Sequence, residues 1–340
     1  MDHHNKTMHW NTLIDEFRGF GGTAENVVQR EGEFGLGLFP IDNSQPVELR
    51  APDHLLVSTD NIELQDNEIV IKDESQYPAG FSDWYRQFQA NYSWGAEAKR
   101  SIETFEKGLI SLPANIHQLL EKRGLVLEGR INNSAEAPNI LKRFIATRRI
   151  KRNNKNVLMP IIELVNHSPQ QRSWSMDEKG ISITGTYSDE ILVRYSACDP
   201  LHRFLQYGFN CNEINGFSLN LKVNHHDKVV YIKGGINHDL KKPPRVSLND
   251  NKIIIDRPMI GSSKRPRIPR TLFKQALEGV NGIDADELFD QVCQNNRLAI
   301  ISLIKQLDNA EGYILSQLQT ACLQQLVAIG YHFGEKTIPD

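Results

Sequence analysis

Two apolar segments of the chain end in residues whose types could support chemistry. The first, Leu158 to Ser168, has the sequence LMPIIELVNHS, and the second, Ile191 to Asn210, has the sequence ILVRYSACDPLHRFLQYGFN. Each begins as an apolar run typical of a buried strand and continues into small polar or ring-bearing residues that a core does not need. Asn166 and His167 offer an amide, an imidazole and two backbone N–H groups at the edge of the first strand. These groups suit the binding of a small polar ligand.

Two tyrosines in the second segment extend this hypothesis. Tyr195 and Tyr207 stand twelve positions apart, so both phenols could reach the same pocket. A simpler interpretation stays open for each motif taken singly, in which Asn-His-Ser forms a turn and both tyrosines belong to the core. The two segments together are more specific than either of them alone.

In this order the segments resemble the SET-domain methyltransferases, in particular the branch typified by the RuBisCO large-subunit lysine methyltransferase. In that branch a strand runs into Asn-His-Ser, a later apolar strand ends in tyrosine, and a helix closes on Tyr-Gly-Phe. The matching residues here are Asn166, His167, Ser168, Tyr195, Tyr207, Gly208 and Phe209. Trp10 to Gly22, WNTLIDEFRGFGG, resembles the opening helix and Gly-Gly of the branch, and Gly35 to Leu38, GLGL, resembles its glycine-rich hairpin. The resemblance covers residues 10–212.

The resemblance implies S-adenosylmethionine as the cofactor and a lysine side chain of a protein substrate as the methyl acceptor. It implies catalytic roles for Tyr195, whose hydroxyl would orient the amine and the methyl group, and for Tyr207, which would line the acceptor channel. The cofactor-binding residues that it implies are Gly35, Leu36, Gly37, Arg148, Asn166, His167 and Tyr195. Among these, Asn166 would bind the amino-acid end of the cofactor, His167 the adenine, and Arg148 the methionine carboxylate.

Methyl transfer from a sulfonium to a neutral amine involves little proton transfer, so positioning and electrostatics dominate its catalysis. A target lysine has to lose its proton, which an apolar channel favours by penalising the ammonium form. Gly35 and Gly37 have no Cβ, so they allow a cofactor to approach the backbone closely and equally suit a plain hairpin turn. Arg148 offers a guanidinium fork that suits a carboxylate, although it also belongs to a basic run typical of a solvated helix face.

The periodicity of the chain alternates between strand and helix, which predicts an α+β fold. Short strands are predicted at residues 26–30, 37–41, 47–49 and 55–58, and helices at 85–92, 101–110, 114–122 and 137–150. Further strands are predicted at 217–223, 229–233, 246–248 and 252–256. A basic linker at 264–270, interrupted by prolines, precedes a helical region with two packed antiparallel helices that are joined at 308–312. The resemblance implies a SET-domain β-clip of small antiparallel sheets with a pseudoknot, a helical SET-I insert and a C-terminal helical lobe.

The resemblance and the changes of periodicity together predict how the chain is divided. Residues 1–75 would form the N-terminal part of the SET domain, 76–152 the helical SET-I insert, 153–215 the C-terminal part with the pseudoknot, 216–263 a β-rich extension, and 264–340 a C-terminal helical lobe similar to the substrate-binding lobe of the branch. A chain of 340 residues with 39% hydrophobic content can bury a core of this extent.

Composition narrows the classes of function. The net charge of −3 argues against a general nucleic-acid binder, so no nucleic-acid partner is expected. The four cysteines lack CxxC spacing and the N-terminal histidines lack carboxylate or cysteine partners, so no metal is expected. No apolar run approaches the roughly 18 residues that cross a bilayer, and the N-terminus lacks the apolar core of a secretory signal. We therefore expect a cytoplasmic monomer that does not bind membranes.

Two alternative functions stay open. A histidine side chain is the nearest alternative acceptor, because one animal member type of the same branch methylates histidine in actin. A SET-fold protein-interaction module with little or no turnover is the alternative from another class, because residues 196–200, SACDP, depart from the pattern that follows the tyrosine in the family. The presence of both Tyr195 and Tyr207 favours an enzyme.

Overall fold

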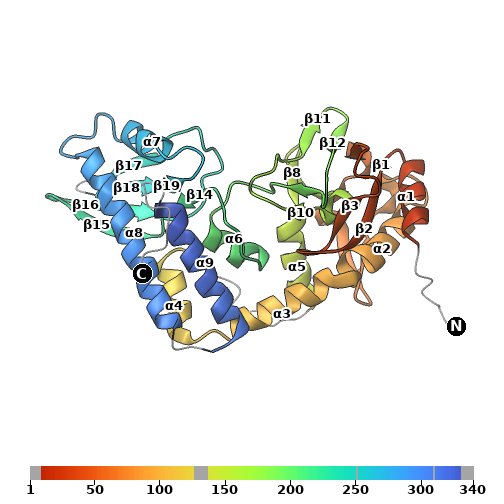
Figure 1. Cartoon of the computed structure of the whole chain (residues 1–340), viewed down its shortest axis with the longest axis horizontal. Coiled ribbons are helices and arrows are strands. Elements are labelled where there is room, and N and C mark those ends of the chain that lie inside the picture. The colour runs from red at the N-terminus through yellow and green to blue at the C-terminus, as the bar shows by residue number, and fades with distance from the viewer. Residues whose placement is uncertain (1–8, 126–136, 250–251, 309–310, 331–340) are drawn as a thin grey trace. The chain divides into compact units, whose positions relative to one another are not determined.

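The structure is a computed structural model that describes residues 9–125, 137–249, 252–308 and 311–330 (Figure 1). The chain forms two compact units, which are described separately. The first unit contains Met1–Glu106 and Asn133–Tyr195, and the second contains Lys107–Asn132 and Ser196–Asp340. Both units combine helices with small sheets, which confirms the predicted α+β class.

Small and mostly antiparallel sheets form much of the first unit. The strands are β1 (Thr23–Glu25), β2 (Val27–Gly32), β3 (Gly35–Pro40), β4 (Val47–Ala51), β5 (Val57–Ser58), β6 (Ile62–Gln65), β7 (Glu68–Ile71), β8 (Ile150–Arg152), β9 (Lys155–Leu158), β10 (Asn166–His167), β11 (Ser175–Asp177), β12 (Gly180–Gly185) and β13 (Leu192–Val193). One sheet has the order β1-β4-β12-β11 and another the order β5-β9-β8, while β2–β3 and β6–β7 are hairpins. The pair β10–β13 differs from these sheets because it is parallel.

Aromatic packing joins the first two helices of this unit. Its helices are α1 (Trp10–Gly19), α2 (Phe81–Tyr92) and α5 (Ala137–Arg148), with a π-helical turn η4 (Trp94–Ala98) and the 3-10 turns η1 (Asp53–Leu55), η2 (Thr59–Asn61), η3 (Glu74–Gln76) and η5 (Ile162–Leu164). Phe17 on the apolar face of α1 stacks on Trp84 of α2 with 5.3 Å between ring centroids, and Trp84 stacks on Phe88 at 5.5 Å. The indole N–H of Trp84 donates to the carbonyl of Leu13 at 2.9 Å, so the buried ring is also satisfied as a donor.

The apolar run that begins the segment Leu158 to Ser168 was predicted to be a buried strand, and this conformation is wrong. Strand β9 ends at Leu158, and pairing resumes only at β10. Pro160 has no backbone N–H to give to a ladder, and Ile161 has a φ of +66° and leads into η5. Ile161 is nevertheless 0% exposed. The apolar run therefore predicted burial correctly, but a proline and a left-handed residue break the strand.

The second unit packs helices against two further sheets. Its helices are α4 (Ala114–Lys122), α6 (Pro200–Tyr207), α7 (Ile268–Ala276), α8 (Ala285–Leu307) and α9 (Tyr313–Gly330), while α3 (Lys99–Ile110) contains residues of both units. Its strands are β14 (Asn215–Phe217), β15 (Leu221–His225), β16 (Lys228–Lys233), β17 (Arg245–Asn249), β18 (Lys252–Asp256) and β19 (Met259–Ser262). One sheet has the order β15-β16-β18-β17, with β16 and β18 parallel, and β14 pairs with β19.

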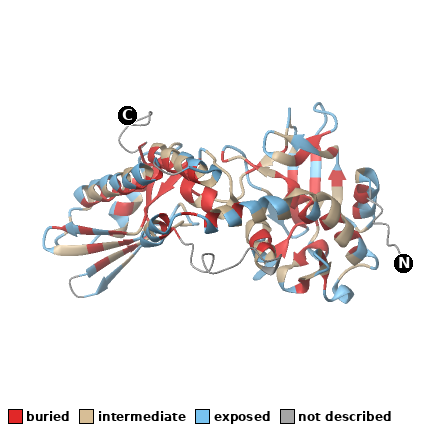
Figure 2. Ribbon diagram, turned by 90° about the horizontal axis from the view of Figure 1, so that it is seen from below, coloured by how far each residue is buried: buried red, intermediate tan, exposed pale blue. Residues whose placement is uncertain are grey.

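The predicted helices and the strands predicted at 229–233, 246–248 and 252–256 are confirmed with small changes in their bounds. The single strand predicted at 217–223 is wrong, because β14 ends at Phe217 and β15 begins only at Leu221. Helix α2 begins earlier than predicted, at Phe81, because Gly80 adopts a φ of +83° and ends the preceding turn. Helix α8 buries one face and exposes the other, as its apolar stripe predicts, whereas the residues of α9 from Ala321 on are all buried or intermediate. Figure 2 colours each residue by burial and shows buried and exposed residues side by side along the helices. Helix α7 begins at Ile268 with Pro269 in its first turn, so the basic linker is not helical throughout. None of the helices in the described residues combines the length and the hydropathy that a bilayer crossing needs.

Replacing Phe88 by alanine should lower the free energy of unfolding by about 3–5 kcal/mol, because a fully buried ring would leave a cavity beside Trp84. Urea denaturation followed by circular dichroism measures this loss. The control is Asp83→Ala on the exposed side of the same helix, where the ion pair with Arg86 spans 3.4 Å and its removal should cost less than about 1 kcal/mol. Equal losses in the two variants would contradict the assignment of the packed face.

Candidate functional site

The parallel pair β10–β13 brings the two segments with candidate chemistry side by side. His167 lies opposite Val193 in the ladder, and the backbone N–H of Ser168 donates to the Val193 carbonyl at 3.0 Å. Asn-His-Ser therefore runs along the strand that leads to the first of the two tyrosines. The two motifs of the sequence meet through backbone hydrogen bonds.

Tyr195 is held on both its backbone and its ring. Its backbone N–H donates to Nδ1 of His167 at 3.1 Å, and its hydroxyl donates to the carbonyl of Val165 at 2.7 Å. The ring centroid of Tyr195 lies 5.0 Å from that of His167 and 6.2 Å from that of Trp174. Since Nδ1 of His167 accepts a hydrogen bond, a neutral imidazole carries its proton on Nε2. These contacts fix the orientation of the phenol, which a residue that positions a substrate requires.

The side-chain amide of Asn166 connects the strand pair to the glycine hairpin. Its Nδ2 donates to the carbonyl of Leu36 at 3.2 Å and to Oε1 of Glu190 at 2.7 Å. These two bonds use both N–H groups of the amide. The amide oxygen accepts no hydrogen bond from the part of the chain that the structure describes, so it can serve a ligand.

Gly37 in β3 allows this connection to form. A Cβ on Gly37 would lie 2.1 Å from Oε1 of Glu190 and 2.7 Å from Nδ2 of Asn166, both shorter than any normal contact. The sequence predicts that a glycine here allows a cofactor to approach the backbone. In the structure the side chains of Glu190 and Asn166 occupy the space that a Cβ would take.

Glu97, which the sequence analysis did not identify, holds the tip of the same hairpin. The backbone N–H of Leu36 donates to its carboxylate at 3.3 Å, and a Cβ on Gly35 would lie 3.3 Å from that carboxylate. Gly35 has a φ of +84°, a conformation that completes the tight turn and favours glycine. Leu36 thus contacts the carboxylate of Glu97 through its N–H and the amide of Asn166 through its carbonyl.

Arg148 ends α5 with an incompletely paired guanidinium. Its Cζ lies 4.3 Å from the ring centroid of Phe144, and its Nη1 donates to Oγ1 of Thr147 at 3.0 Å. Its Nε is buried and has no hydrogen-bond partner in the described structure. Burial lowers the pKa of Arg148, and the negative charge of Glu163 opposes that shift. A buried guanidinium nitrogen without a partner favours a bound anion such as a carboxylate.

Glu163 is a second residue that the sequence analysis missed. Its Oε1 accepts hydrogen bonds from Nε2 of Gln89 at 2.9 Å and from Oγ of Ser93 at 2.8 Å, while its buried Oε2 has no partner among the described residues. Burial raises the pKa of Glu163, and the charge of Arg148 opposes this effect. A carboxylate inside the apolar run IIELV was the signal that could have identified it.

Glu190 is a third carboxylate that the sequence analysis did not assign to the site. Burial raises its pKa, the hydrogen bond from Asn166 opposes this shift, and the nearby charges of Asp189 and Glu33 reinforce it. Three acidic groups, Glu97, Glu163 and Glu190, therefore surround residues that the sequence identified. The sequence contains no local pattern that distinguishes them from the other acidic residues of the chain, except the apolar context of Glu163.

Tyr207 lies in the second unit, at the end of α6. The Cζ atom of Arg203 is 4.6 Å from its ring centroid, and Gly208 closes the helix with a φ of +83°. Arg203 is buried and donates from Nε to Glu213 at 2.6 Å and from Nη2 to the Ser196 carbonyl at 3.1 Å. Burial raises the pKa of Tyr207 and the charge of Arg203 opposes this shift. The pairing of Tyr207 with Tyr195 in one channel stays a prediction.

One group in the second unit has side chains that a metal could bind. His225, His226 and Glu287 each offer one atom, and these atoms lie within 4.8 Å of one another. Nε2 of His225 accepts from the backbone N–H of Asp284 at 3.3 Å, so its Nδ1 carries the proton and donates to Gln291 at 3.0 Å. Both ring nitrogens of this buried histidine are used within the protein, which favours a structural role.

No protein-family model and no curated protein matches the chain. The chain is similar to a solved structure of the SET domain of LSMT bound to lysine and AdoHcy, with a TM-score of 0.41 and 12% identity over 96% of this chain and 91% of that chain. It is similar to a second structure of that domain, bound to MeLysine and AdoHcy, with a TM-score of 0.45 and 12% identity over 95% of this chain and 90% of that chain. Similarity at these TM-scores is too slight to establish a function, which has to be inferred from the residues of this chain.

Glu163→Gln should reduce the pH dependence of stability. Folding raises the pKa of Glu163 above its ordinary value of 4.5, so the folded chain retains a proton that the unfolded chain releases. Stability contributed by this group therefore falls as the pH rises from the ordinary value through the raised one. Glutamine keeps the acceptor for Gln89 and Ser93 and cannot ionise.

Chemical denaturation of the wild type and of Glu163→Gln at a series of pH values from about 4 to about 8 measures how the free energy of unfolding of each protein changes with pH. The wild type should lose more stability than Glu163→Gln as the pH rises. Glu16→Gln, a change at an exposed residue of α1, should follow the wild type. Parallel curves for the wild type and Glu163→Gln would contradict the predicted effect of burial.

Proposed function

We propose that this chain is a SET-domain protein methyltransferase that uses S-adenosylmethionine and methylates a lysine side chain of a protein substrate. The observation that carries the proposal is the connected group around β10–β13. In this group Asn166 binds the glycine hairpin, while the backbone and hydroxyl of Tyr195 bind His167 and Val165. The order of the motifs along the chain, Asn-His-Ser, Tyr and Tyr-Gly-Phe, supports the same assignment.

The polar groups of the first unit fit a ligand whose amino-acid end carries a negative carboxylate and a positive ammonium group. S-adenosylmethionine supplies a methyl group on a positively charged sulfonium. Arg148 would bind its carboxylate, because Nε of Arg148 is buried without a partner. The amide oxygen of Asn166 would accept from its ammonium group. His167 would hold the adenine. The backbone of Gly35, Leu36 and Gly37 would lie close to the cofactor and offer N–H groups to its carboxylate.

The two tyrosines would act on the acceptor. Tyr195 would orient the amine, since its ring and hydroxyl are fixed by His167 and Val165. Tyr207 would line the channel, where the face of its ring attracts a cation. Apolar walls favour the neutral amine over the ammonium form, so the chain needs no strong general base. Backbone carbonyls of the site would accept weak C–H hydrogen bonds from the methyl group.

The remaining parts of the chain would serve the protein substrate. Residues 76–152 would wall the cofactor and acceptor clefts, and residues 264–340 would contact the substrate. We further propose a monomer that works in the cytoplasm.

Two other functions are carried as alternatives. A protein-histidine methyltransferase would use the same residues, and amino-acid analysis of a substrate labelled with a radioactive methyl group distinguishes the two acceptors.

A SET-fold interaction module with weak or no turnover is favoured by one observation. Both N–H groups of the Asn166 amide are already used by Leu36 and Glu190, which leaves only the amide oxygen for a ligand.

Asn166→Ala should weaken the binding of S-adenosylmethionine about tenfold or more, because a hydrogen bond to a charged group would be lost together with the link to the hairpin. Isothermal titration calorimetry of the purified proteins measures this change. Asn156→Ala, at an exposed position of β9, is the matched control and should bind like the wild type. Unchanged affinity in Asn166→Ala would refute the role of this amide, and no binding to the folded wild type would favour the interaction module.

Tyr195→Phe should lower the rate of methyl transfer about a hundredfold, because the hydroxyl that fixes the ring and orients the amine would be lost. Its affinity for S-adenosylmethionine should stay within about threefold of the wild type, since the backbone bond to His167 is kept. Transfer of a labelled methyl group to proteins of a cell lysate provides the measurement. Tyr231→Phe in β16 controls for the substitution itself. Full activity of Tyr195→Phe would disprove the catalytic assignment.

A further inference from the structure

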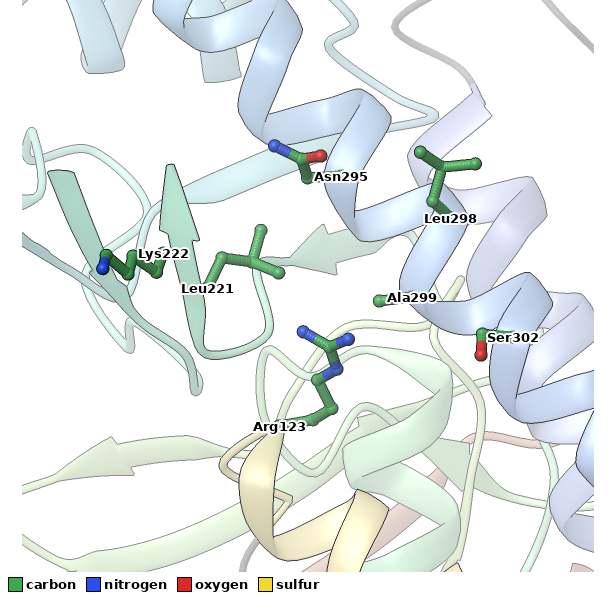
Figure 3. Close-up of a pocket in the computed structure, with 7 residues that line it drawn as sticks. All are labelled: Arg123, Leu221, Lys222, Asn295, Leu298, Ala299 and Ser302. Carbon is green, nitrogen blue, oxygen red and sulfur yellow. The ribbon is translucent and has the colours of Figure 1, made fainter. Parts of the chain in front are cut away.

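The second unit has a hollow of about 230 Å³ between α4, β15 and α8 (Figure 3). It is lined by Arg123, Leu221, Lys222, Asn295, Leu298, Ala299 and Ser302. These side chains are apolar, neutral hydrogen-bonding or positively charged, and none is acidic. The hollow therefore presents a positive, partly apolar surface to a ligand.

Arg123 is the group that gives this hollow its chemistry. Arg123 is half-buried as a residue, and its side chain points from the end of α4 toward the space between β15 and α8 (Figure 3). The described residues provide no hydrogen bond or ion pair to this guanidinium. Keeping a guanidinium partly out of water without a counter-charge costs free energy, which a bound anion would recover.

The backbone of Arg123 is held in place. Its carbonyl accepts from the backbone N–H of Asn220 at 2.8 Å, and Oδ1 of Asn220 accepts from the N–H of Gly234 at 2.7 Å. Gly124 follows with a φ of +73°, and a Cβ there would lie 2.6 Å from the side chain of Asn220. The base of the arginine is thus fixed before any ligand binds, which lowers the entropy lost on binding.

One face of α8 forms the opposite wall. Asn295, Ala299 and Ser302 follow each other at helical spacing, so an amide, a methyl group and a hydroxyl face the same side. Leu221 and Ala299 are each 8% exposed and form an apolar surface. A ligand that fits has an anionic end for Arg123 and a short apolar stem.

The charge of the hollow matches a carboxylate better than a phosphate group. Lys222 lies on the rim, and its side chain extends along the other face of β15, away from Arg123 (Figure 3). One guanidinium balances a single negative charge and forms a bidentate pair with the two oxygens of a carboxylate. Lys222 contributes a longer-range attraction for acidic segments.

We propose that this hollow binds the carboxylate of a glutamate side chain on a protein partner. The Arg123 guanidinium pairs with the carboxylate, Asn295 donates a hydrogen bond to it, and the methylene groups of the glutamate contact Leu221 and Ala299. The site belongs to the second unit alone and does not depend on methyl transfer. It gives the chain a means of selecting partners with an exposed acidic residue.

Nuclear magnetic resonance titration of the full, isotope-labelled chain tests this proposal. The probe is the peptide acetyl-Gly-Ala-Glu-Ala-Gly-amide, and the signals are the side-chain amide of Asn295 and the backbone amide of Ala299. Both should shift with peptide concentration. The same peptide with glutamine in place of glutamate should leave them unchanged, because it has no charge for Arg123.

The variant Arg123→Gln should raise the dissociation constant for the glutamate peptide about tenfold or more, since a charge-assisted pair is lost. Lys122→Gln removes the same charge from the neighbouring exposed residue and should change it less than about twofold. Equal effects of the two variants would overturn the proposal in favour of diffuse attraction. It would also be overturned by a failure of the glutamate peptide to shift the two signals, by equal binding of the glutamine peptide, or by tighter binding of a phosphoserine peptide.

Discussion

The two-residue parallel ladder β10–β13 is the constraint on which the candidate site depends. It holds His167 beside Val193, and the chain that leaves it places the N–H of Tyr195 on the ring of His167. A ladder this short has few hydrogen bonds of its own. It is stabilised by the buried residues around it, and Ile191 extends it to the hairpin by donating to the carbonyl of Leu38 at 2.8 Å.

Two buried ionisable residues, Glu163 and Arg148, lie near the β10–β13 ladder. Glu163 and Arg148 each interact with the other's charge, and each keeps one buried polar atom without a partner among the described residues. Such atoms reduce stability, because desolvation is not repaid by a hydrogen bond. The second unit contrasts with this arrangement around Asp199, whose carboxylate accepts from His202, Gln325 and the backbone of Phe217. The second unit also has buried polar atoms without a partner among the described residues, such as Nη1 of Arg203. Those of Arg148 and Glu163 differ in that they lie beside the residues of the candidate site.

Local patterns in the sequence predicted much of the fold. The helical periodicity of the C-terminal region predicted α8 and α9 and the break between them. Helical periodicity depends on residues three and four apart, so a short stretch contains the information. The residues of the candidate site could be named for a similar reason, because their motifs are contiguous in the chain.

The sequence by itself thus determined the α+β class, most of the helices, and the candidate roles of Asn166, His167 and Tyr195 that motif order suggests. Tertiary structure decided that Pro160 and Ile161 break the first segment, that the two segments pair in parallel, and that Glu190 binds the amide of Asn166. These features depend on contacts between residues far apart in the chain, and no periodicity of three, four or two residues encodes such contacts. The hollow of the second unit that contains Arg123 also depends on tertiary structure, because three separate segments of the chain line it.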